Sequence, residues 1–233
     1  MNLQEQISRM KSMMGMDNSR LTFDIQKLVD NEIIFVTEPG DGQGEIAKPN
    51  WEGDCSVITL ANLTPQEMFE LGSFGGTYWR PIHSSITGKN YKNQHKKYPK
   101  SWWKNIPESW LVTQWDKYDV SINKYGVKVG TTLEFWEEKG WITEYDPYGW
   151  VQWYANFYQG RRTPDDLRQI RRWKGVAGEN GRWRNYLITL ILRKNLKWND
   201  VSASPKIWQI LQHWGYKLNK RDFNKEVKER SQK

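Results

Sequence analysis

The feature that most limits the fold of this chain is a run of large aromatic residues at helical spacing. Trp150, Trp153, Tyr154 and Phe157 stand at i, i+3, i+4 and i+7, so one face of a helix carries all four rings. The chain holds 15 tryptophans, whereas its hydrophobic fraction is only 37%, so rings more than aliphatic side chains must build the interior. The stripe is therefore predicted to be buried. The neighbours that fall off it and are expected at the surface are Tyr148, Gln152 and Tyr158.

Recurring helix-start signals predict an α+β fold that is mainly helical. Thr64 and Pro65 precede Glu67, the spacing of a capping box, and Gly72 is a suitable stop. Similar starts occur at Asp146-Pro147, Thr163-Pro164 and Ser204-Pro205, and further helices are expected within 131–140 and 181–195. The last start opens a helix expected to carry Ile207, Ile210, Leu211, Trp214 and Leu218. A few short strands, at 31–38 and 55–60, are expected on the N-terminal side of this aromatic-rich core.

The pattern divides the chain into four parts. Residues 1–16 have apolar side chains on one helical face and predict an amphipathic helix or tag that docks on a protein partner. Residues 17–54 combine a strand with a flexible linker rich in Gly and Pro. Residues 55–225 are expected to form a single globular domain, and 226–233 a basic tail.

Composition and motifs exclude several classes of protein. Cys55 is the single cysteine, which excludes an internal disulfide framework and fits a reducing compartment. No apolar run approaches the roughly 20 residues of a membrane helix, so we expect a soluble protein of the cytoplasm, or of the host cytoplasm or virion if it is viral. The sequence predicts no metal site and no cofactor, because the histidines are scattered and no nucleotide-binding fingerprint occurs.

Positive charge is concentrated in the C-terminal part. Residues 146–233 carry 19 Lys and Arg against 8 Asp and Glu, a net of +11, whereas residues 1–145 have a net of −3. Such an imbalance is typical of a surface that binds a polyanion, most often nucleic acid, although it also serves solubility alone.

Seven arginines and one lysine fall within residues 146–184, and the preference for arginine is informative. A guanidinium pairs bidentately with phosphate and stacks on rings, which lysine does less well. We therefore predict a DNA- or RNA-binding surface, with the exposed aromatic residues of 78–103 stacking on bases; the alternative is that Asp165 and Asp166 neutralise these side chains. The predicted nucleic-acid-binding residues are Arg161, Arg162, Arg168, Arg171, Arg172, Arg182 and Arg184.

A second group of residues suggests a pocket. The turn at Gly75-Gly76 is followed by rings, an arginine and a histidine, and a second glycine-containing turn follows Asp146. Rings beside cationic groups suit a planar, anionic or base-like ligand. The candidate pocket residues are Tyr78, Trp79, Arg80, His83, Asp146, Tyr148 and Gln152. The competing interpretation places the rings in the core and pairs Arg80 with an acidic helix.

Two resemblances add to these patterns. The motifs FGGTYWRPI and DPYGWVQWYANFYQGRR, within roughly residues 55–220, resemble a family of fungal, bacterial and phage proteins with no established activity, so the resemblance implies no catalytic residues. Residues 1–16 are similar to the short amphipathic leader segments of tailed phages of aquatic origin.

Three hypotheses of function follow. The first is a nucleic-acid-binding protein, of phage origin and involved in DNA processing or modification. The second is a small-ligand or nucleobase-processing enzyme whose pocket lies between residues 74–84 and 146–152. The third is a virion or assembly component that docks through residues 1–16.

Overall fold

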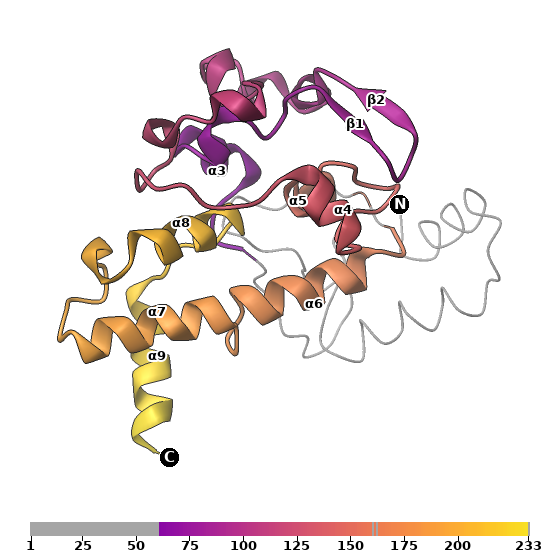
Figure 1. The fold of residues 1–233 in the computed structure, drawn as a ribbon. Coiled ribbons are helices and arrows are strands. Elements are labelled where there is room, and N and C mark those ends of the chain that lie inside the picture. The colour runs from indigo at the N-terminus through magenta and orange to yellow at the C-terminus, as the bar shows by residue number, and fades with distance from the viewer. Residues whose placement is uncertain (1–60, 160, 162, 233) are drawn as a thin grey trace, which may run out of the picture.

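Seven α-helices and one hairpin form most of the regular structure in the part of the chain that the computed structural model describes, residues 61–159, 161 and 163–232 (Figure 1). The helices are α3 (Pro65–Glu70), α4 (Leu133–Glu138), α5 (Trp150–Tyr158), α6 (Asp166–Val176), α7 (Arg182–Arg193), α8 (Pro205–His213) and α9 (Lys220–Ser231). Antiparallel strands β1 (Ile82–Ser84) and β2 (Lys89–Tyr91) pair with His83 opposite Asn90. The fold is therefore mainly helical α+β, as predicted. The helix expected in 1–16 and the strands expected at 31–38 and 55–60 lie outside the described residues.

Between the hairpin and α4 the chain forms short 3-10 helices in place of α-helices or strands. They are η2 (Gln94–Lys97), η3 (Lys100–Trp102), η4 (Glu108–Trp110), η5 (Trp115–Lys117) and η6 (Val120–Ile122), while η1 (Phe74–Gly76) precedes β1 and η7 (Val201–Ala203) precedes α8. Figure 1 shows α6 and α7 following each other along one side of the molecule, with the hairpin and these short turns on the opposite side. Helix α5 lies between them and packs against α3 and α6, and α7 packs against α8 and α9.

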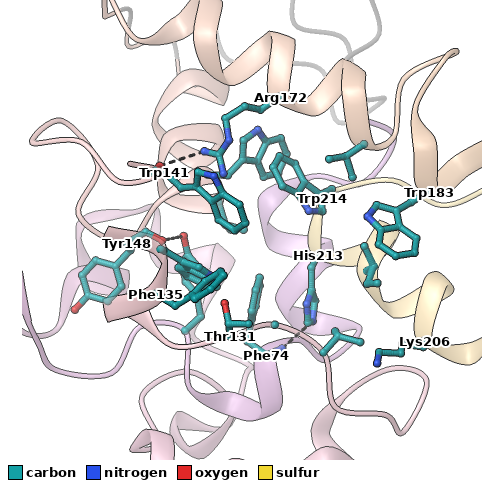
Figure 2. Close-up of a pocket in the computed structure, with 18 of the residues that line it drawn as sticks. Phe74, Thr131, Phe135, Trp141, Tyr148, Arg172, Trp183, Lys206, His213 and Trp214 are labelled. Carbon is teal, nitrogen blue, oxygen red and sulfur yellow. Dashed lines mark hydrogen bonds between the residues drawn. The ribbon is translucent and has the colours of Figure 1, made fainter. Parts of the chain in front are cut away.

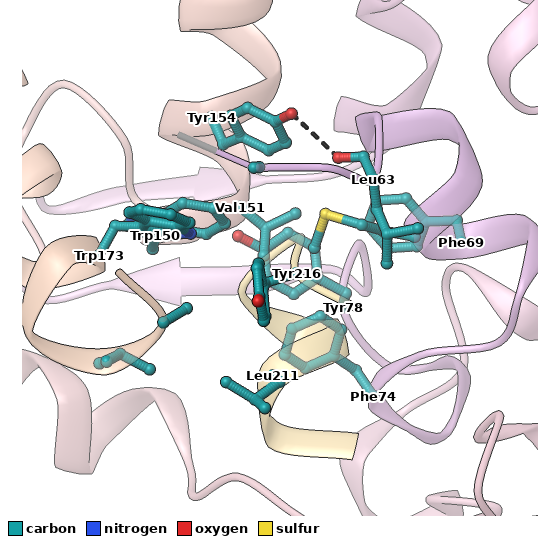
Figure 3. Close-up of a cluster of buried hydrophobic side chains, with 14 of the residues drawn as sticks. Leu63, Phe69, Phe74, Tyr78, Trp150, Val151, Tyr154, Trp173, Leu211 and Tyr216 are labelled. Atoms are coloured by element: carbon teal, nitrogen blue, oxygen red, sulfur yellow. Dashed lines mark hydrogen bonds between the residues drawn. The ribbon is translucent and has the colours of Figure 1, made fainter. Parts of the chain in front are cut away.

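One cluster of buried hydrophobic residues connects these elements, and the predicted aromatic stripe lies in it. Trp153 and Tyr154 are fully buried, Phe157 and Trp150 nearly so. The Tyr154 hydroxyl donates to the carbonyl oxygen of Leu63 at 2.9 Å, which ties α5 to the segment before α3 (Figure 3). The prediction that rings build the core is confirmed.

The prediction that Tyr148 and Gln152 are exposed is wrong, because both belong to a cap at the start of α5. Helix α5 begins after Gly149, which has no side chain that could cap it. The Gln152 side chain accepts from the Tyr148 backbone N–H at 2.8 Å, and the Tyr78 hydroxyl accepts from the Gln152 backbone N–H at 2.9 Å. The Tyr78 hydroxyl thus satisfies one free N–H of the first turn, and the Gln152 side chain satisfies the N–H of Tyr148 just before the helix, so both side chains stay buried. Tyr158 is partly buried.

The sequence signals locate two helix starts correctly and misplace two. Thr64 and Glu67 form the predicted capping box of α3, and Ser204 caps α8. Helix α5 starts at Trp150 rather than at Pro147, because the buried Asp146 carboxylate binds Asn156 and Arg161 and cannot cap the helix. Helix α6 starts at Asp166, whose carboxylate accepts from the backbone N–H of Thr163 at 3.0 Å. For α5 a competing tertiary partner therefore explains why the signal fails, whereas at α6 the Thr163–Asp166 contact is local and the start is shifted along the chain.

The C-terminal part departs from its expected boundaries. Helix α8 ends at His213, and two residues later Gly215 has a positive φ of 64°, which turns the chain away from the helix. Leu218 is therefore buried beyond the helix and not on it. The boundary expected after residue 225 falls inside α9, which begins with Asn219 as its cap.

Candidate functional site

An open cavity of about 400 Å³ lies between η1, α4, the start of α5, α6, α7 and α8 (Figure 2). This volume is near the lower end of the range for small-molecule sites. Its lining includes nine aromatic side chains, three cations and, within the described part of the chain, no carboxylate. The cavity therefore offers stacking surfaces and positive charge to a ligand.

The floor of the cavity is buried and mostly aromatic. Its rings come from η1 and the segment that leads to β1 on one side, and from the start of α5 and the end of α8 on the other. They are Phe74, Tyr78, Tyr148, Trp150 and His213. The Tyr78 hydroxyl donates to the Tyr148 carbonyl oxygen at 2.6 Å, and the Tyr148 hydroxyl donates to the Arg80 carbonyl oxygen at 2.7 Å. Burial raises the pKa of both phenols, so they stay protonated at neutral pH. These tyrosines supply rigid surface rather than acid–base groups.

The rim is exposed and carries both rings and charge. Phe135 and Trp141 keep more than a third of their surface accessible and meet edge to face, with ring centroids 5.8 Å apart. Arg182, at the start of α7, and Lys206, in the first turn of α8, are also exposed. A ligand that enters from solvent meets these groups first.

Arg172 connects the rim to the floor. Its guanidinium carbon lies 5.6 Å from the ring centroid of Trp141 and 5.5 Å from that of Trp214. One terminal nitrogen donates to the Trp141 carbonyl oxygen at 3.2 Å and to Gln169 Oε1 at 2.8 Å. Burial and the nearby Arg168 lower the pKa of Arg172 to about 10, so it is still charged at neutral pH. A half-buried cation that has no carboxylate partner in the described part of the chain is thus held against the cavity.

His213 is the buried imidazole of the floor. Its ring stacks on Phe74 with centroids 3.8 Å apart, and its Nε2 accepts from the Phe74 backbone N–H at 2.9 Å. Desolvation lowers its pKa to about 3, so the ring is neutral across the physiological range.

The structure brings only two of the seven predicted pocket residues to this cavity, Tyr78 and Tyr148. Their position does fall between residues 74–84 and 146–152, where the pocket was expected. The expected place therefore coincides with one part of the cavity, whereas five of the seven chosen residues do not line it.

The other five predicted pocket residues are used elsewhere. Trp79 and Gln152 are buried, the first against Tyr98 and Tyr148 and the second in the cap of α5. Arg80 donates to the Thr77 carbonyl oxygen at 3.0 Å, and the exposed His83 contacts Asn90 across the hairpin at 2.9 Å. Asp146 is fully buried against Asn156 and Arg161. None of the five lines the cavity.

The predicted nucleic-acid-binding arginines also fall into groups: some pair with aspartates, and others line the cavity or are exposed. Arg161, Arg168 and Arg184 form ion pairs with Asp146, Asp165 and Asp222. Arg168, which pairs with Asp165, also donates to the carbonyl oxygens of Gly140 and Trp141, so the alternative in which Asp165 and Asp166 neutralise the arginines holds for Arg168. Arg172 and Arg182 line the cavity, and Arg171 is exposed. Arg162 lies outside the described residues.

The aromatic residues expected to stack on bases are mostly not available for it. Tyr78, Trp79 and Tyr98 are buried in the core, and Trp102 and Trp103 are partly buried against it. That part of the nucleic-acid prediction is wrong, because these rings supply the interior that the few aliphatic residues do not.

Sequence reasoning missed most of the cavity lining. Phe135, Trp141, Trp183, Lys206, His213 and Trp214 come from four separate segments, and only tertiary packing brings them together. The interleaving of rings with basic residues was the one signal of their role. It occurs around Trp183 and from Lys206 to Trp214, whereas Phe135 stands among glutamates.

Comparison of the chain with protein-family models, with curated proteins and with solved structures found no match. Within the described residues, no cluster of three or more His, Cys, Asp or Glu side chains is placed to hold a metal ion. No helix in that part of the chain has the length and apolar character needed to cross a membrane.

Proposed function

We propose that this protein binds a planar aromatic ligand that carries negative charge, the chemistry of a nucleoside phosphate, in the cavity between η1, α5 and α8. The observation that carries the proposal is that the described residues place nine Phe, Tyr and Trp rings and three cations, but no carboxylate, around one space of about 400 Å³. Rings stack on a flat ligand, and cations at the rim neutralise its anionic group. An acidic ligand enters such a site without like-charge repulsion.

The proposal favours binding over a reaction within the cavity. The Tyr78 and Tyr148 hydroxyls are committed to backbone carbonyl oxygens, and His213 Nε2 already accepts from Phe74. General acid–base catalysis needs a group that exchanges a proton near the working pH. The described lining supplies cations and donors for recognition instead.

Titration calorimetry with nucleoside monophosphates, the matching nucleosides and inorganic phosphate tests the proposal. We expect the monophosphates to bind, the nucleosides to bind more weakly, and phosphate alone to bind weakest, because stacking and charge act together. Arg182→Gln removes one rim charge and is expected to weaken monophosphate binding by roughly five- to tenfold, about 1 kcal/mol.

The matched control is Arg193→Gln, which removes an exposed arginine from the other end of α7, away from the cavity. This variant is expected to bind all three ligand classes like the wild type. If no monophosphate binds at millimolar concentration, or if the two variants behave alike, the proposal is wrong.

Nucleic acid remains a second candidate because of the charge of the C-terminal part. Residues 146–233 carry a net charge of +11, and Arg171, Lys174, Arg182 and Lys206 are exposed on α6, α7 and α8. A single strand with an unstacked base would offer the same ring and phosphate chemistry to the cavity. Fluorescence anisotropy with labelled single-stranded DNA is expected to show binding that weakens steeply between low and moderate salt. Absence of binding at low salt contradicts this candidate.

A further inference from the structure

The orientation of His213 is fixed by two donors that meet at the same ring nitrogen. The Gln209 side chain accepts from the Tyr125 backbone N–H at 2.9 Å through Oε1, which fixes the orientation of its amide. The amide nitrogen of Gln209 then lies 3.0 Å from His213 Nε2, and the Phe74 backbone N–H donates to the same atom at 2.9 Å. Because both neighbours are donors, Nε2 must be the acceptor.

The proton of the neutral ring therefore lies on Nδ1. Within the described residues no protein group pairs with Nδ1, and this atom is not among the fully occluded polar atoms that lack a partner. His213 lines the cavity, where Figure 2 shows its ring at the edge of the open space with its hydrogen bond directed to the backbone of Phe74. An accessible, unpaired N–H on a buried residue is a group that a ligand can satisfy.

Trp150 gives the floor the same character. It also lines the cavity, and its Nε1–H is buried without a hydrogen-bond partner in the described part of the chain. The unsatisfied polar atoms of His213 and Trp150 are thus N–H donors.

We propose that His213 is a specificity-determining residue whose Nδ1–H recognises a hydrogen-bond acceptor on the edge of the bound ring, a carbonyl oxygen or an unprotonated ring nitrogen. This inference rests on the proposed function and deepens it, since it selects among planar anionic ligands those with an acceptor at the inner edge. A ligand with a C–H at its inner edge leaves the Nδ1–H of His213 without a partner and shielded from water. Such a ligand therefore binds more weakly than one with an acceptor at that position.

The neutral state of His213 makes this recognition insensitive to pH near neutrality. Among residues 61–159, 161 and 163–232, no carboxylate lines the cavity. The cations facing it there are Arg172, Arg182 and Lys206, which disfavour a further positive charge on His213. The only acceptor role of the ring is already taken by Phe74 and Gln209.

The first test is a long-range ¹H–¹⁵N spectrum of the wild-type imidazole, which distinguishes a protonated from an unprotonated ring nitrogen. We expect His213 to carry its proton on Nδ1 at pH 7. A proton on Nε2 overturns the inference whatever the ligand, and it leaves the proposed function standing.

The second test measures binding of matched ligand pairs by calorimetry. The pairs are purine nucleoside monophosphates and their 3-deaza and 7-deaza analogues, in which C–H replaces a ring nitrogen, and 6-oxo and 6-unsubstituted purine monophosphates. We expect at least one lost acceptor to weaken wild-type binding about tenfold or more. If the parents bind and every pair is equal, the inference is wrong and the proposed function stands. If no parent binds, both fail.

Two variants separate the donor from the packing of the ring. His213→Gln places an amide oxygen near the position of Nε2, keeping an acceptor for Phe74 while removing the donor, so the wild-type preference is expected to fall below about threefold. His213→Asn instead places an amide nitrogen near the position of Nδ1, so it is expected to be less stable but to keep the preference. Equal discrimination in the wild type and His213→Gln contradicts the inference.

Discussion

Arg168 and Arg172 lie one turn apart on α6, yet their surroundings differ in the way that most matters for function. Arg168 ends at the Asp165 carboxylate, with its Nε 2.5 Å from Oδ1. Arg172 ends between the rings of Trp141 and Trp214 and has only neutral hydrogen-bond acceptors. The same residue type is thus neutralised by a carboxylate in one place, whereas in the other its positive charge stays beside a cavity.

The difference extends to two regions of the molecule. In the carboxylate-paired region, formed by Asp146, Arg161, Asp165 and Arg168, each charge meets a partner within the protein. In the cavity region, which contains Arg172, Arg182 and Lys206, cations meet rings and solvent. A charge that is already paired gains little from a ligand, whereas a cation without a carboxylate partner among the described residues gains one from an anion, so the proposed anion site is placed in the second region.

The largest effect is expected from breaking the paired region at Asp146. Asp146→Asn keeps the shape of the side chain but leaves the guanidinium of Arg161 facing a neutral group at a fully buried position. Burial raises the pKa of Asp146 while Arg161 and Asn156 oppose that shift, so the pair contributes through its hydrogen bonds as well as its charge. We expect a loss of about 3 kcal/mol in the free energy of unfolding, measured by urea denaturation.

Asp116→Asn is the matched control, because Asp116 is exposed. This change is expected to stay within about 0.5 kcal/mol of the wild type. A loss at Asp146 no larger than that of the control means that the paired region does not hold this part of the fold. Pairing with a carboxylate would then make no measurable difference to the free energy of unfolding, and the two regions would not differ in this respect.

A smaller effect is expected from acidifying the cavity region, where His213 has a pKa lowered by burial to about 3. In the unfolded chain the pKa of a histidine is about 6.5, so the unfolded state binds the proton first as the pH falls. Stability is complete above about pH 6.5 and is lost progressively toward pH 3; at pH 5 the contribution of His213 to the loss is about 2 kcal/mol.

Unfolding measurements at pH 7 and pH 5 for the wild type and His213→Gln isolate this contribution. The variant lacks the titrating ring, so we expect its stability to fall less between the two pH values, by about 2 kcal/mol. Parallel pH dependence of the two proteins would show that His213 titrates in the folded state as it does in the unfolded chain. The floor of the cavity would then be wetter than its burial indicates.

Sequence patterns predicted the parts of this molecule that depend on local periodicity. The stripe on α5, the capping box at Thr64 and the cap at Ser204 follow from spacing alone. Patterns failed where a distant partner competed for the same group, as when Asp146 bound Arg161 instead of capping a helix. No local signal indicates which partner a side chain such as Asp146 binds, because that depends on which groups are buried together in the folded core.

The candidate site was predictable in position but not in composition. Its two sides, near Tyr78 and Tyr148, were expected from glycine-containing turns, and both line the cavity. His213 ends α8 and Trp214 follows it, more than sixty residues after Tyr148, and neither carries a motif that joins it to those turns. The arginines were recognised as a group, but the division between paired and unpaired members depends on the placement of Asp146, Asp165 and Asp222.

The smallest effect on stability is expected at Arg171, which tests whether the unpaired charge extends from the cavity to a nucleic-acid surface. Arg171 is exposed on α6, with Arg168 and Lys174 three residues away on either side, so its removal relieves like-charge repulsion of a few tenths of a kcal/mol. Arg171→Gln should therefore leave thermal unfolding nearly unchanged. If Arg171 contacts phosphate, the slope of log affinity against log salt should fall by about 0.7 on single strands or about 0.9 on duplex DNA. Arg193→Gln, at the far end of α7, should leave the slope as it is. An unchanged slope in Arg171→Gln would mean that this arginine touches no phosphate, and the cations of the cavity would remain the proposed contacts for an anion.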